Sequence, residues 1–301
     1  MGGLFFWQRG NNYSMKRILI TGANSYTGNA VAEYLSAWPE IYHVSKISLR
    51  NDSWKSENFG AFDSIIHTAG IAHDSTRTSD KDSYFRVNSQ LAFDTANKAM
   101  NDGARQFIFM SSSIVYGASA AIGHEKIITQ STPVSPESYY GESKVKAEEM
   151  ITNLDGDKFH VCILRCPMIY GKNCRGNYPI LSKIARRLPA FPKIKNTRSM
   201  LYVKNFAEFI RLMIENSERG IFWPQNGEYS NTSGIVKMIA ESHGKKIALI
   251  PGCEIPLKVL AKFSGLVNKA FGSLAYDMNL SQYRENYRLY DLRRSIDESE
   301  G

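Results

Sequence analysis

The sequence has few cysteines and no long hydrophobic run. Its four cysteines, at positions 162, 166, 174 and 253, form no C-x-x-C pair. This spacing argues against a zinc site and against a disulfide framework, so we expect no metal and reduced thiols in a cytoplasmic protein. The apolar stretches fall far below the roughly 18 residues that a membrane-spanning helix needs. The apolar run Leu4–Trp7 is too short for a signal peptide, and we expect residues 1–14 to be a tail.

The sequence also lacks a concentrated run of basic residues, although its formal net charge is +8. No four lysines or arginines stand together and no nucleic-acid-binding motif occurs, so we expect neither a nucleic-acid partner nor stable membrane insertion. The charge still admits a phosphorylated small molecule or an anionic surface as partner. Hydrophobic residues at 43 % and charged residues at 22 % are near the globular average, which excludes disordered, collagen-like and coiled-coil chains.

Short apolar segments alternate with amphipathic ones in the first half of the chain. The apolar segments are rich in isoleucine, valine and phenylalanine, as strands buried on both faces are. The predicted strands are 17–21, 46–49, 64–70, 105–112 and 160–166. The predicted helices lie near 27–38, 80–101 and 138–153. This alternation predicts an α/β fold, a Rossmann-like doubly wound parallel sheet, over residues 15–166.

Prolines and glycines interrupt the chain after Cys166, and shorter elements follow. We expect a smaller, mostly helical substrate-binding region over residues 167–280, folded over the edge of the sheet. Its predicted helices lie near 204–216 and 231–243. Residues 257–274 have a basic amphipathic pattern, which fits a helix packed on this region better than a helix lying on a membrane surface. Residues 281–301, dense in arginine, glutamate and serine, predict a solvated tail.

A glycine turn connects the first predicted strand to the first predicted helix. The segment reads Thr-Gly-Ala-Asn-Ser-Tyr-Thr-Gly, and a strand that enters a helix through such a turn presents backbone N–H groups to a pyrophosphate. Gly22 allows the tight turn, and Gly28 lets the helix pack closely on the strand. Ser25 stands where a dinucleotide site usually has glycine, and its hydroxyl can donate to a phosphate. The residues expected to contact a cofactor here are Gly22, Asn24, Ser25, Tyr26, Thr27 and Gly28.

Tyr140 and Lys144 stand four residues apart in a predicted helix, which puts both side chains on one face. An ammonium group beside a phenol lowers the phenol pKa, so that the tyrosine can exchange a proton near neutral pH. The spacing alone is not specific, because Tyr42 and Lys46 form a second such pair at a predicted strand. Placement favours the first pair, since Ser112 ends a predicted strand at the edge where open α/β sheets hold their ligands.

Several segments occur together in the order and at the intervals typical of one enzyme family. They are Thr21–Gly28, His67–Gly70, Val87–Asn88, Ser111–Gly117, Tyr140–Lys144 and Leu164–Arg165. Over about residues 15–275 the chain resembles the extended short-chain dehydrogenase/reductase family, which includes the NAD-dependent epimerases, dehydratases and 4-keto reductases of nucleotide sugars.

This resemblance implies a bound NAD or NADP and a catalytic set of Ser112, Tyr140 and Lys144. Tyr140 would exchange a proton with the sugar 4-oxygen while C4 exchanges a hydride with the nicotinamide. Lys144 would bind the nicotinamide ribose and lower the pKa of Tyr140, and Ser112 would orient the sugar. The other residues implied to line the cofactor are Thr68, Ala69, Gly70, Asn88 and Pro167.

The resemblance also implies a UDP-sugar site in the second region. Arg198 stands where the family binds the sugar-nucleotide diphosphate, and a guanidinium fits a pyrophosphate through a bidentate fork. Asn177 falls where a substrate-binding asparagine is expected. A homodimer through the helices near 80–101 and 138–153 is a further expectation at the level of the family.

Departures from the family pattern narrow the reaction. Dehydratases carry Asp-Glu just before the Val-Tyr-Gly segment, whereas this chain has Ser113 and Ile114, which argues against 4,6-dehydration. Met168 replaces an asparagine of many 4-epimerases. Arg50, at the end of the second predicted strand, suits a 2′-phosphate and slightly favours NADP over NAD, the alternative being a solvated arginine. Residues 51–62 are too few for the usual third strand and its helix, so the adenine side of the sheet is trimmed.

The sequence thus predicts an NAD(P)-dependent oxidoreductase acting at C4 of a UDP-sugar. The favoured reaction is reduction of a UDP-4-keto-6-deoxy-N-acetylhexosamine for surface polysaccharide synthesis. Arg50 motivates this choice, because a net reduction consumes NADPH whereas an epimerase recycles a retained NAD. The alternatives are a UDP-glucose or UDP-N-acetylglucosamine 4-epimerase and, from a different class, a non-catalytic NAD(P)-binding regulator.

Overall fold

The computed structural model describes residues 15–71, 81–261 and 265–301, and the tail expected over residues 1–14 lies outside them. The described chain forms a parallel sheet of six strands in the order β10-β6-β4-β3-β1-β2. The strands are β1 (Lys16–Thr21), β2 (Tyr42–Ile47), β3 (Ser64–His67), β4 (Gln106–Ser112), β6 (His160–Cys166) and β10 (Gly220–Phe222). This sheet confirms the predicted Rossmann-like α/β fold.

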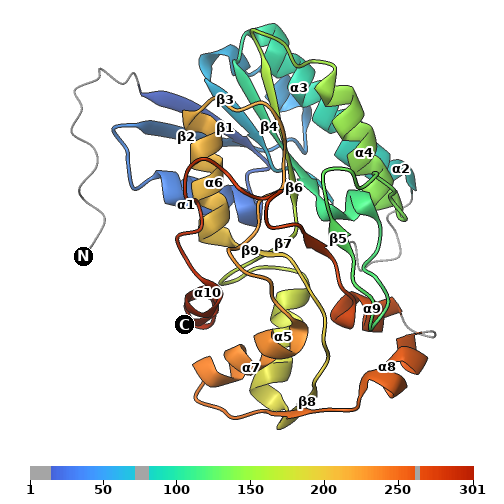
Figure 1. Ribbon diagram of the computed structural model, residues 1–301. Coiled ribbons are helices and arrows are strands. Elements are labelled where there is room, and N and C mark those ends of the chain that lie inside the picture. The colour runs from blue at the N-terminus through green and yellow to red at the C-terminus, as the bar shows by residue number, and fades with distance from the viewer. Residues whose placement is uncertain (1–14, 72–80, 262–264) are drawn as a thin grey trace.

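Helices cover both faces of the sheet (Figure 1). One face is covered by α1 (Tyr26–Leu35) and α6 (Val203–Glu215). The other is covered by α3 (Leu91–Asp102) and α4 (Tyr139–Thr152), with α2 (Lys81–Tyr84) and a π-helical segment over Phe85–Gln90 leading into α3. The helix expected near 80–101 is therefore confirmed as one continuous helical run, with a π-helical segment in its first half.

Alternate residues of β1 enter different layers of the core, because successive side chains of a strand point to opposite faces. Ile20 is fully buried in one cluster with Phe206 of α6. Leu19 is buried in the other, with Ala96 of α3 and Ala147 of α4. The double covering explains why the strands are continuous apolar runs rather than alternating ones.

The boundary expected at residue 166 does not divide the fold. Both α6 and β10 follow that residue, yet α6 packs beside α1 and β10 pairs in parallel with β6 as the last strand of the sheet. Long apolar helices can pack on either region, so the sequence alone did not reveal which one α6 would join. The sheet domain is thus completed by a segment from the second half of the chain.

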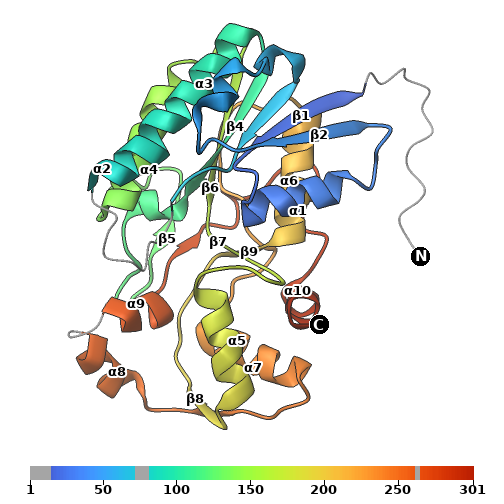
Figure 2. The ribbon, with the colours of Figure 1, turned by 180° about the vertical axis from the view of Figure 1, so that it is seen from behind.

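The remaining segments of the second half form a separate cluster below the sheet, as Figures 1 and 2 show from opposite sides. Its helices are α5 (Asn177–Arg187), α7 (Thr232–Ser242), α8 (Glu254–Ala261), α9 (Gly265–Phe271) and α10 (Leu292–Glu300). Short strand pairs join them: β7 (Met168–Tyr170) with β9 (Met200–Tyr202), β8 (Ala190–Pro192) with β11 (Ala248–Ile250), and β5 (Ile127–Ile128) with β12 (Ala275–Tyr276).

Two expectations for the C-terminal part are wrong. The single helix expected over 257–274 is two short helices, α8 and α9, on either side of residues 262–264. The solvated tail expected over 281–301 is packed, because Tyr287 is buried in the sheet domain and α10 buries Leu292 and Ile296 in the second region. Of the charged residues that suggested a tail, Arg293, Arg294 and Asp297 lie on the exposed face of α10.

The chain between β2 and β3 is short, as its length predicts. It contains no strand and only two brief 3-10 turns, Asp52–Ser56 and Phe59–Ala61. Trp54 and Phe59 from these turns are buried against the α3 side of the sheet. They cover the part of the sheet that a longer connection with its own helix would otherwise cover. The second strand lies earlier than the predicted 46–49, at Tyr42–Ile47, so the second Tyr-Lys pair is indeed in a strand.

Candidate active site

The turn after β1 lies tightly against the loop after β3. Gly22 has a φ of +89°, and a Cβ there would lie 2.9 Å from the backbone nitrogen of Ala69. A Cβ on Gly28 would lie 2.9 Å from Thr68 Oγ1 and 2.9 Å from a methyl group of Ile20. Both predicted glycines are therefore required by close approach, and the structure brings them to Thr68 and Ala69 as the family pattern implies.

The Ser25 hydroxyl caps the amino end of α1, whereas the sequence suggested that it donates to a phosphate. Its Oγ accepts from the Gly28 N–H at 3.1 Å and shares a hydrogen bond with Thr27 Oγ1 at 3.0 Å, which makes it the helix N-cap. The N–H groups of Tyr26 and Thr27, in the first helical turn, have no intrahelical acceptor and suit an anion. Asn24 is exposed in the turn. A pyrophosphate fits this backbone cradle, which a Cβ at Gly22 would distort.

The Tyr26 side chain has a different place from the one expected. Its hydroxyl is buried, and a Cβ on Gly171 would lie 2.7 Å from it. Its ring packs against the cluster of the second region. Only the backbone of Tyr26 can therefore serve a cofactor in the turn, while its ring joins the two regions.

Substitution of Gly22 should be more costly than a positive φ alone explains. Gly22→Ala adds left-handed strain and a contact with Ala69, for which we expect a loss of about 2–4 kcal/mol in the free energy of unfolding. Gly103→Ala is the matched control, because Gly103 has a φ of +95° with no atom within 4 Å of an added Cβ, and should cost about 1 kcal/mol. Urea unfolding measures both, and equal losses would show that the contact with Ala69 is unimportant.

The Asn88 side chain forms hydrogen bonds with both the loop after β3 and α4. The side chain is fully buried in the π-helical segment, a rare distortion that occurs often at functional sites. Its Oδ1 accepts from the Ile71 N–H at 2.9 Å, and its Nδ2 donates to Ile71 O at 2.9 Å and to Ser143 Oγ at 3.1 Å. A Cβ on Gly70 would lie 3.0 Å from Asn88 Oδ1 and 3.7 Å from Lys144 Nζ. Asn88 thus holds Gly70 beside Lys144.

Ser112, Tyr140 and Lys144 meet at the carboxyl end of β4. Ser112 is the last residue of the strand, and its hydroxyl hydrogen-bonds the Tyr140 phenol. Lys144 Nζ donates to Met110 O at 2.7 Å and lies 4.6 Å from the centre of the Phe109 ring. The predicted catalytic set is therefore assembled by one strand end and one face of α4.

The protonation of this set differs from the simple expectation. The pKa of Tyr140 is raised to about 12, chiefly because burial disfavours the phenolate, while the bond with Ser112 lowers it. The expected lowering by Lys144 is not seen, because the ammonium is directed at the Met110 carbonyl. Burial also lowers the pKa of Lys144 to about 8, against the opposing effect of the Glu148 carboxylate.

A buried ion pair lies next to the predicted catalytic set, and the sequence motifs did not indicate it. Glu148 accepts from the Arg165 guanidinium, with Nη2 to Oε2 at 2.6 Å, and from the Ser111 hydroxyl. Arg165 Nη1 also donates to the Tyr116 hydroxyl at 2.7 Å. The sequence does indicate the position of Glu148. It follows Lys144 by four residues, as Lys144 follows Tyr140, so all three side chains share a face of α4.

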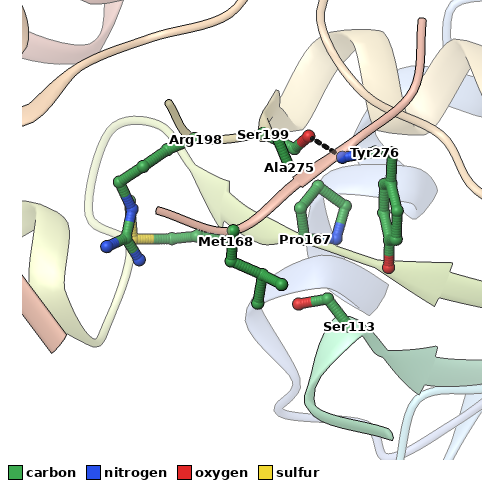
Figure 3. Close-up of a pocket in the computed structure, with 8 residues that line it drawn as sticks. Ser113, Pro167, Met168, Arg198, Ser199, Ala275 and Tyr276 are labelled. Atoms are coloured by element: carbon green, nitrogen blue, oxygen red, sulfur yellow. Dashed lines mark hydrogen bonds between the residues drawn. The ribbon is translucent and has the colours of Figure 1, made fainter. Parts of the chain in front are cut away.

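A small pocket beside Ser112 is walled by both regions of the molecule. Figure 3 shows Ser113 and Arg198 on different sides of Pro167 and Met168. The remaining lining residues are Ser199, Leu274, Ala275 and Tyr276. Ser199 adjoins the predicted Arg198. The sequence motifs did not indicate Leu274, Ala275 and Tyr276, because these residues reach the pocket through long-range contacts: β12 pairs with the distant β5, and the Ser199 N–H donates to Leu274 O at 3.1 Å.

Of the residues expected to bind substrate, Arg198 reaches this pocket and Asn177 does not. Arg198 Nη1 donates to Lys269 O at 2.9 Å and to Gly272 O at 3.1 Å, and burial lowers its pKa. Asn177 is exposed at the start of α5 and is not among the residues that line the pocket. Pro167, expected beside the cofactor, lies in the pocket wall, and Arg50 is exposed after β2.

The chain matches one protein family over most of its length. Residues 18–222 match the NAD dependent epimerase/dehydratase family. The chain belongs to this family. The matched residues span the whole six-stranded sheet apart from the start of β1 and include every element that carries the glycine turn, Ser112, Tyr140 and Lys144. The resemblance inferred from the motifs is confirmed.

Two curated relatives cover most of the chain. A UDP-glucose 4-epimerase of Vibrio cholerae is 24 % identical over 301 residues, 90 % of this chain and 90 % of that protein. An N-acetyl-alpha-D-glucosaminyl-diphospho-ditrans,octacis-undecaprenol 4-epimerase of Escherichia coli O157:H7 is 26 % identical over 260 residues, 79 % of this chain and 75 % of that protein.

Solved structures share the fold. A UDP-glucuronic acid 4-epimerase from Bacillus cereus, in complex with NAD, has a TM-score of 0.70 at 17 % identity and covers 94 % of this chain and 97 % of that one. A dTDP-4-dehydrorhamnose reductase from Bacillus anthracis, in complex with NADP, has a TM-score of 0.64 at 20 % identity, covering 79 % and 84 %. These neighbours hold either nicotinamide cofactor.

We expect the activity of this family member to fall at alkaline pH as Lys144 loses its proton. Because the pKa of Lys144 is about 8, its ammonium loses the proton as pH rises through that value, and the charge is fully present only below it. We expect kcat/KM to fall above about pH 8. Lys144→Arg keeps the charge at all these pH values, so its lower activity should show no such fall. A wild-type profile that stays flat from neutral to alkaline pH would contradict this assignment.

Proposed function

We propose that the protein exchanges a hydride and a proton at C4 of a UDP-sugar, and that it reduces a UDP-4-keto-6-deoxy-N-acetylhexosamine with NADPH or NADH. The observation that carries the proposal is the Ser112–Tyr140–Lys144 set at the end of β4. It adjoins a pocket with Arg198 in its wall. A hydroxyl pair for the sugar oxygen and a cation for a diphosphate are what this chemistry requires.

A nicotinamide cofactor would supply the hydride when bound, and the side chains of this chain would supply the proton and the orientation. Ser112 and Tyr140 both donate to the 4-oxygen, and Tyr140 delivers its proton as that oxygen gains charge. A Tyr140 pKa of about 12 keeps the phenol protonated at neutral pH, which suits a proton donor to a ketone. Lys144 would hold the nicotinamide ribose beside them.

Arg198 is suited to the diphosphate of the substrate. Its bonds to the Lys269 and Gly272 carbonyls use Nη1, and a guanidinium carries five N–H donors in a planar fork. The two carbonyls fix the direction of the side chain at the pocket wall. A fixed fork of this kind favours a bidentate anion, and the sugar would then extend toward Ser113 and Ser112.

Arg50 supports reduction over epimerisation. It is exposed three residues after the end of β2, on the side of the sheet where a 2′-phosphate of NADPH would be recognised, and NADPH is the cofactor of net reductions. A 4-epimerase is the second candidate, since the two curated relatives are both named 4-epimerases and would use the same serine, tyrosine and lysine. The homodimer and the cytoplasmic location stay predictions.

Reduction and epimerisation can be distinguished by whether the reaction consumes added cofactor. Incubation with a UDP-4-keto-6-deoxy-N-acetylhexosamine should oxidise NADPH in stoichiometric amounts. Interconversion of UDP-N-acetylglucosamine and UDP-N-acetylgalactosamine without added cofactor would instead establish the epimerase. Arg50→Ala should raise the KM for NADPH more than the KM for NADH, and equal effects on both would remove Arg50 from the argument.

A further inference from the structure

One long stretch of the sequence has basic residues without acidic ones. From Lys158 to Ala207 the chain has no aspartate or glutamate. Within this stretch, Lys183, Arg186 and Arg187 are exposed on α5, where they line a shallow groove with Pro179. Helix α5 thus presents a row of cations to solvent without an acidic residue beside them in the sequence.

The strand pair that follows α5 continues this charge. Lys193 and Lys195 are exposed after β8, and Lys245 and Lys246 are exposed before β11. The two strands are parallel neighbours, and the Lys193 N–H donates to Ile250 O at 2.8 Å. Lysines from two distant parts of the sequence therefore flank one strand pair, one group at each end of it.

Helix α8 adds apolar side chains to the same end of the molecule. It packs on the second region through Leu257 and Ala261, which are one helical turn apart. Its other side is also apolar: Ile255 is 76 % exposed, Val259 53 % and Leu260 51 %. A helix of a soluble domain normally turns polar residues to solvent, so an apolar outer side indicates a binding surface.

These features share one end of the molecule. Figures 1 and 2 both place α5, β8 and α8 at the end away from the sheet. The glutamates of the neighbouring helices α7 and α10 form ion pairs with other side chains. Glu241 pairs with Lys237 and Arg293, Glu298 with Lys204, and Glu300 with His243.

We propose that this end, the basic apolar face of α5, the β8–β11 pair and α8, docks on the surface of an anionic lipid bilayer. Lysines and arginines beside a bilayer are attracted to anionic headgroups, and exposed apolar side chains enter the acyl boundary. A second copy of the chain is a poorer occupant, because two such faces carry the same charge. No helix of the described residues is long and apolar enough to cross a membrane, so the contact is peripheral.

This inference goes beyond the proposed reaction and does not depend on it, because its test needs no substrate. The full chain is floated with vesicles of phosphatidylcholine, with and without phosphatidylglycerol. We expect flotation only with the anionic vesicles, weakening as salt screens the charges. Lys193→Gln and Lys195→Gln should each reduce the partition coefficient roughly fivefold, and Ile255→Asp combined with Val259→Asp should abolish flotation.

Matched controls test the location of the surface. Lys158→Gln removes an exposed charge at the amino end of β6, and Leu289→Asp removes an exposed apolar group outside the face, so both should float as the wild type does. The proposal is overturned if the protein ignores anionic vesicles, if it floats equally with neutral ones, or if the controls lose as much binding. It is also overturned if the α8 variants convert a dimer to a monomer without lipid, which would show that a second copy covers the face.

Discussion

Tyr140→Phe should lower kcat by about 10²- to 10⁴-fold, the usual contribution of a positioned general acid or base. The substitution removes one hydroxyl at the end of β4 and leaves the ring in place, 6.2 Å from the Tyr84 ring by centroids. Affinity for the nicotinamide cofactor should change little, because the glycine turn and Lys144 are untouched. Steady-state kinetics and cofactor titration separate the two effects.

The second tyrosine-lysine pair provides a matched control for this experiment. Tyr42 precedes Lys46 by the same four residues, but both lie in β2 and the Tyr42 hydroxyl donates to Glu215 at 2.6 Å. Tyr42→Phe should cost about 1 kcal/mol of stability through the lost hydrogen bond and leave kcat unchanged. If Tyr140→Phe kept full biological effect while losing turnover, the protein would be a cofactor-binding regulator rather than an enzyme.

The sheet domain was predictable because its signals are local. Buried parallel strands appear as apolar runs, and the glycine turn between β1 and α1 is a motif of consecutive residues, although the contacts that require Gly22 and Gly28 come in part from Thr68 and Ala69. The π-helical segment that carries Asn88 could not be predicted from local sequence, because Asn88 forms hydrogen bonds with the loop after β3 and with α4. The packed C-terminus was missed because α10 has few apolar residues, and their partners are far away in sequence.

The candidate site divides in the same way. Ser112 and the Tyr140–Lys144 pair follow from a strand end and a helical spacing, and the structure brings them together. Their protonation does not follow from spacing, because burial raises the pKa of Tyr140 and lowers that of Lys144. Tyr276 reaches the pocket wall through contacts between distant segments, the β5–β12 pairing and a hydrogen bond from its N–H to Ser199 Oγ at 2.7 Å, which no pattern of the sequence indicates.

Arg165→Met should be the most destabilising single substitution near the site. It leaves the Glu148 carboxylate, with a side chain only 7 % exposed, without its cation. Removal of one partner from a buried pair costs about 3–5 kcal/mol, since the remaining charge is neither solvated nor compensated. A chain of this size loses about 2–4 °C in Tm per kcal/mol, so we expect a fall of roughly 10 °C by calorimetry. A loss below about 1 kcal/mol would contradict the importance of this pair.

The double variant Arg165→Met with Glu148→Leu tests the reason for that loss. Apolar replacement of both partners removes the uncompensated charge, so most of the stability should return. The return is partial, because the Ser111 hydroxyl loses its acceptor. The pH profile gives an independent measurement: the Glu148 carboxylate raises the pKa of Lys144, so its removal should lower that pKa and move the alkaline loss of activity to lower pH. A double variant that regains stability with an unchanged profile would show that Glu148 supports the fold without tuning Lys144.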